Sequence, residues 1–265
     1  MVQVIDFKPE ESVNAILAVP TIREEKDLLL ATRKGEIKRM SLGALANIHA
    51  NGLNAMNLEP GDELVSVRVA TGQDELIMVS KNGFSIRFPV AQLRSRSRAA
   101  GGVRGMKLRE GDTVVAMEML VPEEHLLVIS ERGYGKPTPL DRYRKQNRGG
   151  NGLSTFRITP KSGPVATARV VSEGEDILIL SKRGQETRTS LSELRLLSRR
   201  TQGVSIVALP EGDEVVSIAP MEPRIRTARD TTPRQAQGNS SARLEVSSET
   251  LSTNGHKTED EEEQP

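Results

Sequence analysis

The stretch "ELIMVSKNGFSIRFP", residues 75–89, has the pattern of two strands joined by a tight turn. Residues 75–80 and 84–88 are short and rich in apolar and β-branched side chains, as strands are. Between them, the turn "SKNG" ends in Gly83, which can adopt a positive φ at no steric cost. The stretch therefore predicts a β-hairpin.

The same hairpin signature recurs about every 50 residues, which indicates an internal repeat. Its copies are "ATRKGEIKR", "VSKNGFSIR", "ISERGYGKP" and "LSKRGQETR", centred on Gly35, Gly83, Gly133 and Gly184. Two further glycine series keep the same phase: Gly52, Gly102, Gly152 and Gly203, and Gly61, Gly111, Gly163 and Gly212. Three series in phase make a chance match very improbable.

Each repeat contains four strand-like runs, and no segment shows a sustained helical period. In the second repeat the predicted strands are 63–70, 75–80, 84–88 and 103–108. Four-stranded units repeated every ~50 residues predict blades arranged radially. We therefore expect an all-β fold, a propeller-like β-pinwheel of four-stranded blades.

The repeats divide the chain into a folded body, residues 1–220, and a tail, residues 221–265. The expected body holds four full repeats, approximately 11–58, 61–108, 111–158 and 163–209, with end strands at 2–6 and 213–219. Such end strands indicate a fragment of a larger protein, or a body whose end strands complete a neighbouring blade. The tail is rich in Ser, Thr, Pro, Gln and charge and ends in "EDEEE", so it is expected to be disordered.

Composition excludes several classes of protein. The chain has 265 residues, no cysteine and a net charge of +1, which combines a mildly basic body with an acidic tail. Disulfides and thiolate metal sites are therefore excluded, and no apolar stretch approaches the ~20 residues of a membrane helix. We expect a cytoplasmic protein. Because aromatic residues are scarce, the core should be aliphatic and base-stacking platforms are not expected.

The connection between the third and fourth strands is basic in three of the four repeats. In the first repeat it is "GALANIHANG", which has no Lys or Arg. The candidate nucleic-acid contacts in the other three are Arg94, Arg96, Arg98, Arg104, Arg142, Arg144, Lys145, Arg148, Arg195, Arg199 and Arg200. Arginine suits phosphate because its planar guanidinium can donate two parallel hydrogen bonds, and glycines let the backbone come close. If the blades surround an axis, these loops share one rim and form a basic track. The alternative is three merely solvated loops.

The acidic tail could compete with DNA for the track or simply aid solubility.

No enzyme constellation is present, so no catalytic residue and no metal ligand is assigned. His49, His125 and His256 are scattered without metal-ligand spacing, and no phosphate-binding loop motif exists. Tyr143, in "RY" at 142–143, is expected to anchor the base of its loop rather than act as a nucleophile.

Three long strings carry a family resemblance that covers about residues 2–220. They are "GGVRGMKLREGDTVVAM", "SERGYGKPTPLDRY" and "RRTQGVSIVALPEGDEVVSI". They resemble the C-terminal domain of the DNA gyrase A protein and of its topoisomerase IV relative. The resemblance implies a β-pinwheel that wraps double-stranded DNA on its basic perimeter and supports ATP-dependent negative supercoiling by the holoenzyme. It also implies partners in the gyrase B protein and the rest of the gyrase A protein, no membrane contact, and a nucleoid-associated location. ATP and Mg²⁺ would be bound by other domains, with no cofactor in this chain. The family's catalytic tyrosine lies in an upstream domain and is neither Tyr134 nor Tyr143.

The family's wrapping signature is a heptad, Gln-Arg-Arg-Gly-Gly-Lys-Gly, in its first blade. Here "QNRGGNG" resembles it through Gln146, Arg148, Gly149, Gly150 and Gly152. Asn147 and Asn151 replace the two other basic residues, and this copy lies in the third visible repeat. The resemblance therefore implies a weakened, blade-level copy of the box.

Two other functions stay open at this point. One is the corresponding C-terminal domain of topoisomerase IV, because the sequence does not separate the two families. The other is a protein-interaction β-propeller whose basic rim meets an acidic partner.

Overall fold

The computed structural model describes residues 13–19, 25–46 and 52–221, and these residues form an all-β fold. Two compact units divide the chain, Met1–Arg224 and Ile225–Pro265, and the described residues all belong to the first. The predicted end strand at 2–6 and the predicted tail beyond residue 221 lie outside the described residues, as do His49 and His256. None of the helices in the described part has the length and hydropathy needed to cross a membrane.

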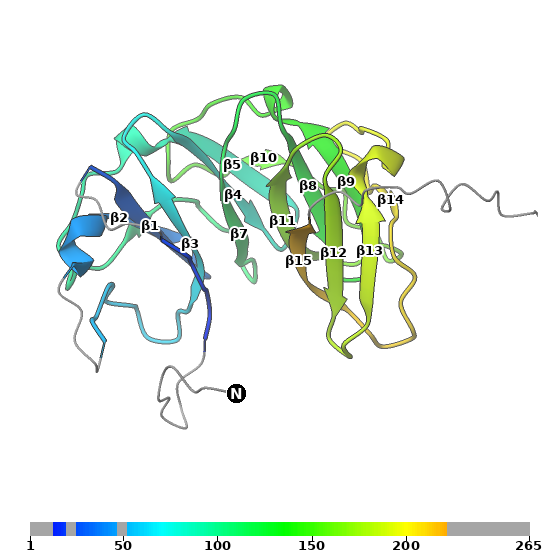
Figure 1. Cartoon of the computed structure of the whole chain (residues 1–265), viewed down its shortest axis with the longest axis horizontal. Helices are drawn as coiled ribbons and strands as arrows, with labels where there is room; N and C mark the ends of the chain where they lie inside the picture. Colours follow the sequence, from blue (N-terminus) through cyan, green and yellow to red (C-terminus); the bar gives the residue numbers. More distant parts are fainter. Residues whose placement is uncertain (1–12, 20–24, 47–51, 222–265) are drawn as a thin grey trace, which may run out of the picture. The chain divides into compact units, whose positions relative to one another are not determined.

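The described residues form fifteen antiparallel strands and four short 3-10 helices, whose arrangement is drawn in Figure 1. The strands are β1 Asp27–Thr32, β2 Glu36–Ser41, β3 Leu64–Ala70, β4 Glu75–Ser80, β5 Phe84–Pro89, β6 Val103–Arg104, β7 Val114–Met119, β8 His125–Ser130, β9 Tyr134–Pro139, β10 Leu153–Ser154, β11 Val165–Val171, β12 Asp176–Ser181, β13 Glu186–Ser190, β14 Val204–Ser205 and β15 Val215–Met221. The 3-10 helices are η1 Leu42–Leu45, η2 Val90–Gln92, η3 Leu140–Arg142 and η4 Leu191–Glu193.

Within the described ranges the strands form four sheets. The three four-stranded sheets have the orders β3-β1-β2-β6, β10-β5-β4-β7 and β11-β8-β9-β14, and the fourth sheet is β13-β12-β15. Each sheet is built on one of the predicted hairpins, such as β4–β5, whose register pairs Leu76 with Phe88. The all-β, blade-like fold predicted from the repeat is therefore confirmed.

A sequence repeat, however, does not coincide with a sheet. In the second repeat, β4 and β5 belong to the second sheet, whereas β3 and β6 lie at opposite edges of the first. The fourth strand is also shorter than predicted, since β6 ends at Arg104. The reason is that Gly105 N–H and Met106 N–H both turn to the carbonyl of Gly35, at 2.9 and 3.1 Å, and so leave the ladder.

The last strand, β15, shows the same exchange at the end of the described residues. It pairs with β12 along Val215–Met221, close to the predicted end strand at 213–219. It is the third strand of the fourth sheet, so it completes a sheet already begun and does not start a new one.

The core lies between neighbouring sheets, where their apolar faces meet. One cluster joins Leu29 and Ile37 of the first sheet to Leu76 and Met117 of the second. Comparable clusters join the second sheet to the third and the third to the fourth. Strands β3, β7, β11 and β15 contact one another in succession, so the sheets follow in chain order (Figure 1). The core is mainly aliphatic, as expected.

Recurring Gly-Asp pairs fix the hairpin turns. The carboxylate of Asp112 accepts the N–H of Asn82 at 2.9 Å, beside the turn glycine Gly83. Asp62 and Asp213 make the equivalent bond to the turns of the first and fourth hairpins. Each of these turns is thereby tied to the segment that leads into β3, β7 or β15.

Gly83→Ala should destabilise the fold strongly. The glycine has φ +77°, and a Cβ there would lie 2.4 Å from the carbonyl oxygen of Phe156. Gly111→Ala is the matched control, because Gly111 has φ +70° but no described atom within 4 Å of the added Cβ. The control should lose about 1–2 kcal/mol from left-handed strain. Gly83→Ala should lose roughly 1–3 kcal/mol more from the backbone clash, measured by urea unfolding. Equal losses would contradict the clash.

Candidate nucleic-acid interface

Three basic loops each cross from one sheet to the outer edge of the sheet before it. They are residues 94–104, 142–152 and 195–203, called the crossing loops below. Each begins at the end of a 3-10 helix or shortly after it and reaches a two-residue strand, β6, β10 or β14, that pairs with β2, β5 or β9 of the preceding sheet.

The backbone fixes the three crossing loops in equivalent registers. The N–H of Arg96 donates to the carbonyl of Arg39 at 2.8 Å, and Gln146 N–H donates to Arg87 at the same distance. In the third loop, Leu197 N–H donates to the Pro137 carbonyl at 3.1 Å. Because Arg39, Arg87 and Pro137 occupy the same place in their hairpins, the loops are attached to the same edge of successive sheets.

This register aligns the arginines, a pattern that the sequence reading did not identify. Each loop has an arginine eight residues before the glycine at 102, 152 or 203. Each loop has a second arginine four residues before the same glycine. The aligned residues are Arg94, Arg144 and Arg195 in the first series and Arg98, Arg148 and Arg199 in the second. The sequence contains this pattern, and it becomes visible when the three loops are aligned on Gly102, Gly152 and Gly203.

All the predicted contact residues lie on the crossing loops or at their ends, and nearly all are exposed. Only Arg199 is half-buried. Lys145 forms an ion pair with Glu75, and Arg142 lies 3.6 Å from Asp141. Within the described part of the chain, no ion pair or side-chain hydrogen bond is found for Arg94, Arg98, Arg144, Arg195 or Arg200. Their guanidinium groups are therefore available to an anion.

The box-like motif at 146–152 mainly fastens two crossing loops together. The guanidinium of Arg148 donates to the carbonyl of Arg104 at 3.1 Å and to that of Gln92 at 3.3 Å. Arg148 N–H donates to the Gln92 side chain at 2.8 Å, and Gly149 N–H donates to the Gly105 carbonyl at 2.6 Å. Asn147 and Asn151 are exposed. The motif thus ties loop 142–152 to loop 94–104, with part of the Arg148 hydrogen-bonding capacity already used.

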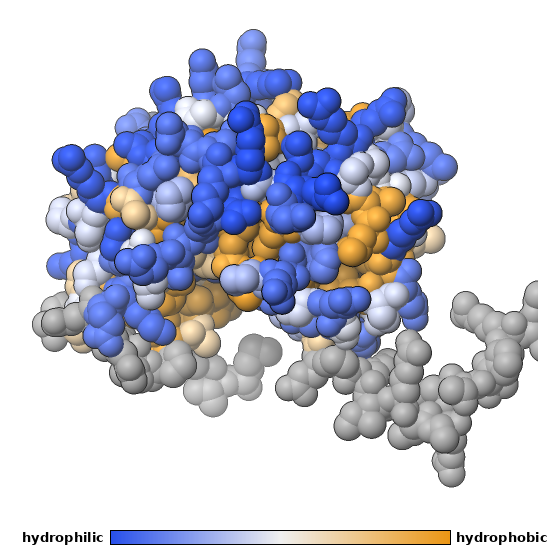
Figure 2. All heavy atoms as spheres, turned by 90° about the horizontal axis from the view of Figure 1, so that it is seen from above, coloured by the Kyte–Doolittle hydropathy of each residue, from blue (hydrophilic) through white to orange (hydrophobic). Residues whose placement is uncertain are grey.

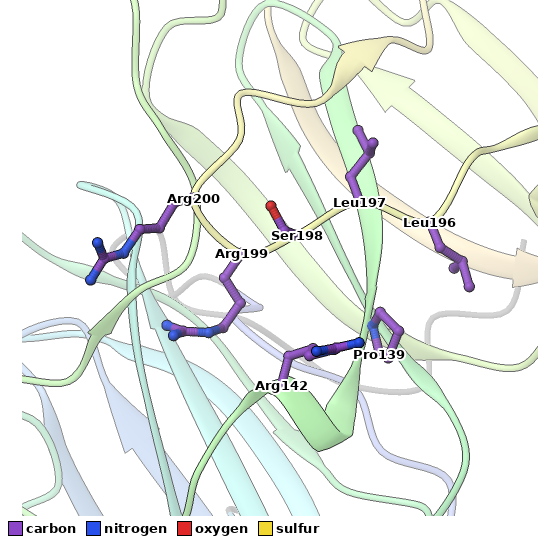
Figure 3. Close-up of a pocket in the computed structure, with 7 residues that line it drawn as sticks. All are labelled: Pro139, Arg142, Leu196, Leu197, Ser198, Arg199 and Arg200. Carbon is purple, nitrogen blue, oxygen red and sulfur yellow. The ribbon is translucent and has the colours of Figure 1, made fainter.

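Arginines from two crossing loops line a hollow of about 640 Å³ (Figure 3). Arg142 comes from the end of η3, and Arg199 and Arg200 come from loop 195–203. Pro139, Leu196 and Leu197 supply its apolar walls, and one guanidinium N–H of Arg199 is engaged by the Ser154 carbonyl at 2.9 Å. Three cations around one open hollow make a site suited to a phosphate group. The face seen in Figure 2 is mostly hydrophilic, with apolar patches between the polar side chains.

Two arginines of the hairpins anchor the crossing loops from below, and sequence reasoning missed them. Arg87 pairs with Glu75 at 2.7 Å and donates to the carbonyls of Leu140 and Tyr143 at 2.9 and 3.0 Å. Arg39 pairs with Asp27 at 2.7 Å and donates to the Leu93 carbonyl at 3.1 Å. Burial would raise the pKa of Glu75, but its bonds to Lys145 and Arg87 outweigh that effect and hold the pKa below its ordinary value.

Two buried lysines, Lys38 and Lys136, also bind carbonyls of the crossing loops, and sequence reasoning did not identify them. Each lies within a strand, three residues after the turn glycine, and each is almost fully buried, at 1% and 0% exposed. Burial, assisted by Arg96, lowers the pKa of Lys38. Burial, assisted by Arg199, lowers the pKa of Lys136 to about 7. The sequence carries no clear signal for this burial, since Lys38 is followed by Arg39 and Lys136 lies between Gly135 and Pro137.

Tyr143 anchors the base of its loop, as predicted. Its side chain is 1% exposed and packs with Leu126, Val128 and Phe156 in the cluster between the second and third sheets. Burial raises the pKa of its hydroxyl. The residue is therefore a packing element of the loop.

Comparison with known proteins identifies relatives of the repeats. The family model of the DNA gyrase C-terminal domain, beta-propeller, matches residues 26–71, 74–120, 124–172 and 175–220. The DNA gyrase A protein of Halalkalibacterium halodurans is 47% identical over 219 residues, covering 83% of this chain and 26% of the relative. The Clostridium acetobutylicum protein is 36% identical over the same shares. The chain thus spans about a quarter of the length of these curated relatives.

Solved structures show the same fold. A DNA gyrase A C-terminal domain matches with a TM-score of 0.76 and 28% identity, covering 82% of this chain and 72% of that one. The C-terminal domain of DNA topoisomerase IV matches with a TM-score of 0.77 over 83% and 69% of the two chains, and its 22% identity supports the fold alone.

The buried amine of Lys136 predicts a pH-dependent stability. Its folded pKa of about 7 lies below the ordinary value of 10.5. Between these values the unfolded chain binds more protons, so the free energy of unfolding should rise with pH. From pH 7 to 9 the wild type should gain roughly 1 kcal/mol or more relative to Lys136→Met, measured by denaturant titration. Parallel pH profiles of the two proteins would contradict this.

Proposed function

The chain belongs to the DNA gyrase C-terminal domain family, and on that premise we propose that it binds and wraps double-stranded DNA as part of the gyrase A protein of a type IIA topoisomerase. The observation that supports this most directly is the aligned arginine pair in each crossing loop. Three such pairs, attached to the same edge of successive sheets, form a track of regularly placed guanidinium groups.

Phosphate recognition accounts for this arrangement better than base recognition. Arginine forks match phosphate oxygens, and contacts to phosphates position a duplex without reading its sequence. Glycines beside the arginines let the DNA backbone approach closely. Scarce aromatic residues argue against stacking on unpaired bases. The proposed ligand is therefore a duplex held through its phosphate backbone, with little dependence on sequence.

Wrapping gives the binding its proposed role. A duplex that follows crossing loops on successive sheets must bend, and the bend has a fixed direction because the loops have one register. In the complete enzyme, wrapping of this kind would support ATP-dependent negative supercoiling. The partners would be the gyrase B protein and the rest of the gyrase A protein, at the nucleoid in the cytoplasm. Other domains would hold ATP and Mg²⁺ and supply the catalytic tyrosine.

The resemblance to topoisomerase IV supports only a shared fold, whereas the gyrase A relatives are similar in sequence as well. A gyrase A role is therefore the proposal made here. A protein-interaction propeller would use the same basic edge for an acidic protein partner.

Neutralising one arginine pair should change the salt dependence of DNA binding. For Arg94→Gln/Arg98→Gln, the slope of log Kd against log salt should fall by about one to two, because each phosphate contact contributes ~0.9. Binding should weaken alike for duplexes of unrelated sequence. The control is Arg33→Gln/Arg183→Gln, which removes two exposed arginines at hairpin turns, outside the crossing loops.

Fluorescence anisotropy at several salt concentrations measures the effect. Equal slopes for the loop variant and the control would overturn the proposed track. Tighter binding to an acidic protein than to a duplex would favour the propeller alternative.

A further inference from the structure

Two lysines occupy the same position in their hairpins and are buried beneath a crossing loop. Lys38 on β2 and Lys136 on β9 each lie three residues after a turn glycine, Gly35 and Gly133. Their side chains are 1% and 0% exposed, so neither can touch DNA. Burying an amine or ammonium is costly unless hydrogen bonds compensate for lost water. The acceptors of these bonds therefore show what the lysines are for.

The acceptors are backbone carbonyls, most of them in the crossing loops. Lys38 Nζ donates to the carbonyls of Arg98 and Ala100 at 2.6 and 2.8 Å, and to that of Ala55 at 2.7 Å. Lys136 Nζ donates to the carbonyl of Arg199 at 2.8 Å and to that of Ser198. Arg98 and Arg199 are equivalent residues of the second aligned series. In each of two loops, a buried lysine thus binds the main-chain carbonyl of the equivalent arginine.

The remaining loop shows what replaces a lysine. Ile86, fully buried, stands at the equivalent position under loop 142–152. Here Arg148, the equivalent arginine, uses its own guanidinium on the carbonyls of Arg104 and Gln92. Where a lysine is present, the equivalent arginine makes fewer side-chain hydrogen bonds: Arg98 is exposed and makes none within the described residues. Arg199, which lines the hollow, makes one, to the carbonyl of Ser154, the residue equivalent to Arg104.

Lys136 can hold its loop in either protonation state. Two N–H groups of Lys136 Nζ donate to the carbonyls of Ser198 and Arg199 in both states. The hydroxyl of Thr138, 3.3 Å from Nζ, accepts from an ammonium and can donate to a neutral amine. Lys38 has three carbonyl acceptors, which need all three protons of an ammonium.

We propose that Lys38 and Lys136 are positioning residues, which fix the main chain of two crossing loops so that Arg98 and Arg199 are presented to phosphate in a single arrangement. The inference rests on the proposed function. Ordering a loop before binding removes an entropic cost that the complex would otherwise bear. Without the lysine, the loop keeps its charge but samples many positions.

Lys136→Met tests the inference, with Ile86→Met as the matched control. Both place methionine at the same position of the repeat, but only the first removes loop hydrogen bonds. Duplex affinity and its salt slope are measured by anisotropy, well below the thermal midpoint of each variant. Lys136→Met should weaken binding roughly three- to tenfold and reduce the salt slope, as Arg199→Gln should, because ordered phosphate contacts are lost. Ile86→Met should bind like the wild type.

Loss of stability alone would not reproduce this result, since a folded protein with an ordered loop keeps its salt slope. If Lys136→Met does not fold, two other variants test the same prediction. Lys136→Gln keeps a polar side chain at this position, and Lys38→Met removes the lysine beneath the other loop. Wild-type affinity and slope in the lysine variants, beside weakened Arg98→Gln and Arg199→Gln, would overturn the inference and leave the proposed function intact. Unchanged binding in the arginine variants would instead overturn the proposed function.

Discussion

The exchange of one short strand between neighbouring sheets is the constraint on which the rest of the structure depends. Each crossing loop leaves its own sheet after a 3-10 helix and pairs as a two-residue strand with the sheet before it. The chain then returns to its own sheet as the edge strand β7, β11 or β15. Gly35 shows how tightly this is built, because its carbonyl accepts two N–H groups of the returning chain. A blade therefore cannot be placed independently of its neighbour, and neither can the charge on its loop.

The crossing places the arginines, and the guanidinium groups of Arg94, Arg98, Arg144, Arg195 and Arg200 make no hydrogen bond or ion pair within the described residues. Buried and half-buried cations satisfy carbonyls of the loops: half-buried Arg87 holds the base of one loop, and buried Lys136 holds the middle of another. Above Ile86, where no lysine is present, Arg148 uses its guanidinium on two carbonyls, whereas Arg199, above Lys136, uses its guanidinium on one. The basic edge is thus divided between cations that support the loops and cations that remain available to phosphate.

Periodicity predicted the hairpins, the turn glycines and the basic loops, because those features are local. It did not predict that β6 belongs to the sheet of β2, since pairing between distant strands leaves no local trace in a single sequence. The aligned Arg98 and Arg199 were within reach of a sequence argument, whereas the role of the buried Lys38 was not. A lysine in a strand has the pattern of a solvated residue until the acceptors above it are known. The repeat limits, the phosphate contacts and the partners stay predictions.

The central claim is that successive crossing loops contact one continuous duplex, and affinity measured on duplexes of increasing length tests it most directly. Affinity should rise with length until the duplex spans all three loops and then level off. Neutralising Arg195, Arg199 and Arg200, at one end of the series, should make affinity level off at a shorter duplex. The same limiting length for both proteins, or an affinity that does not depend on length, would contradict a shared track.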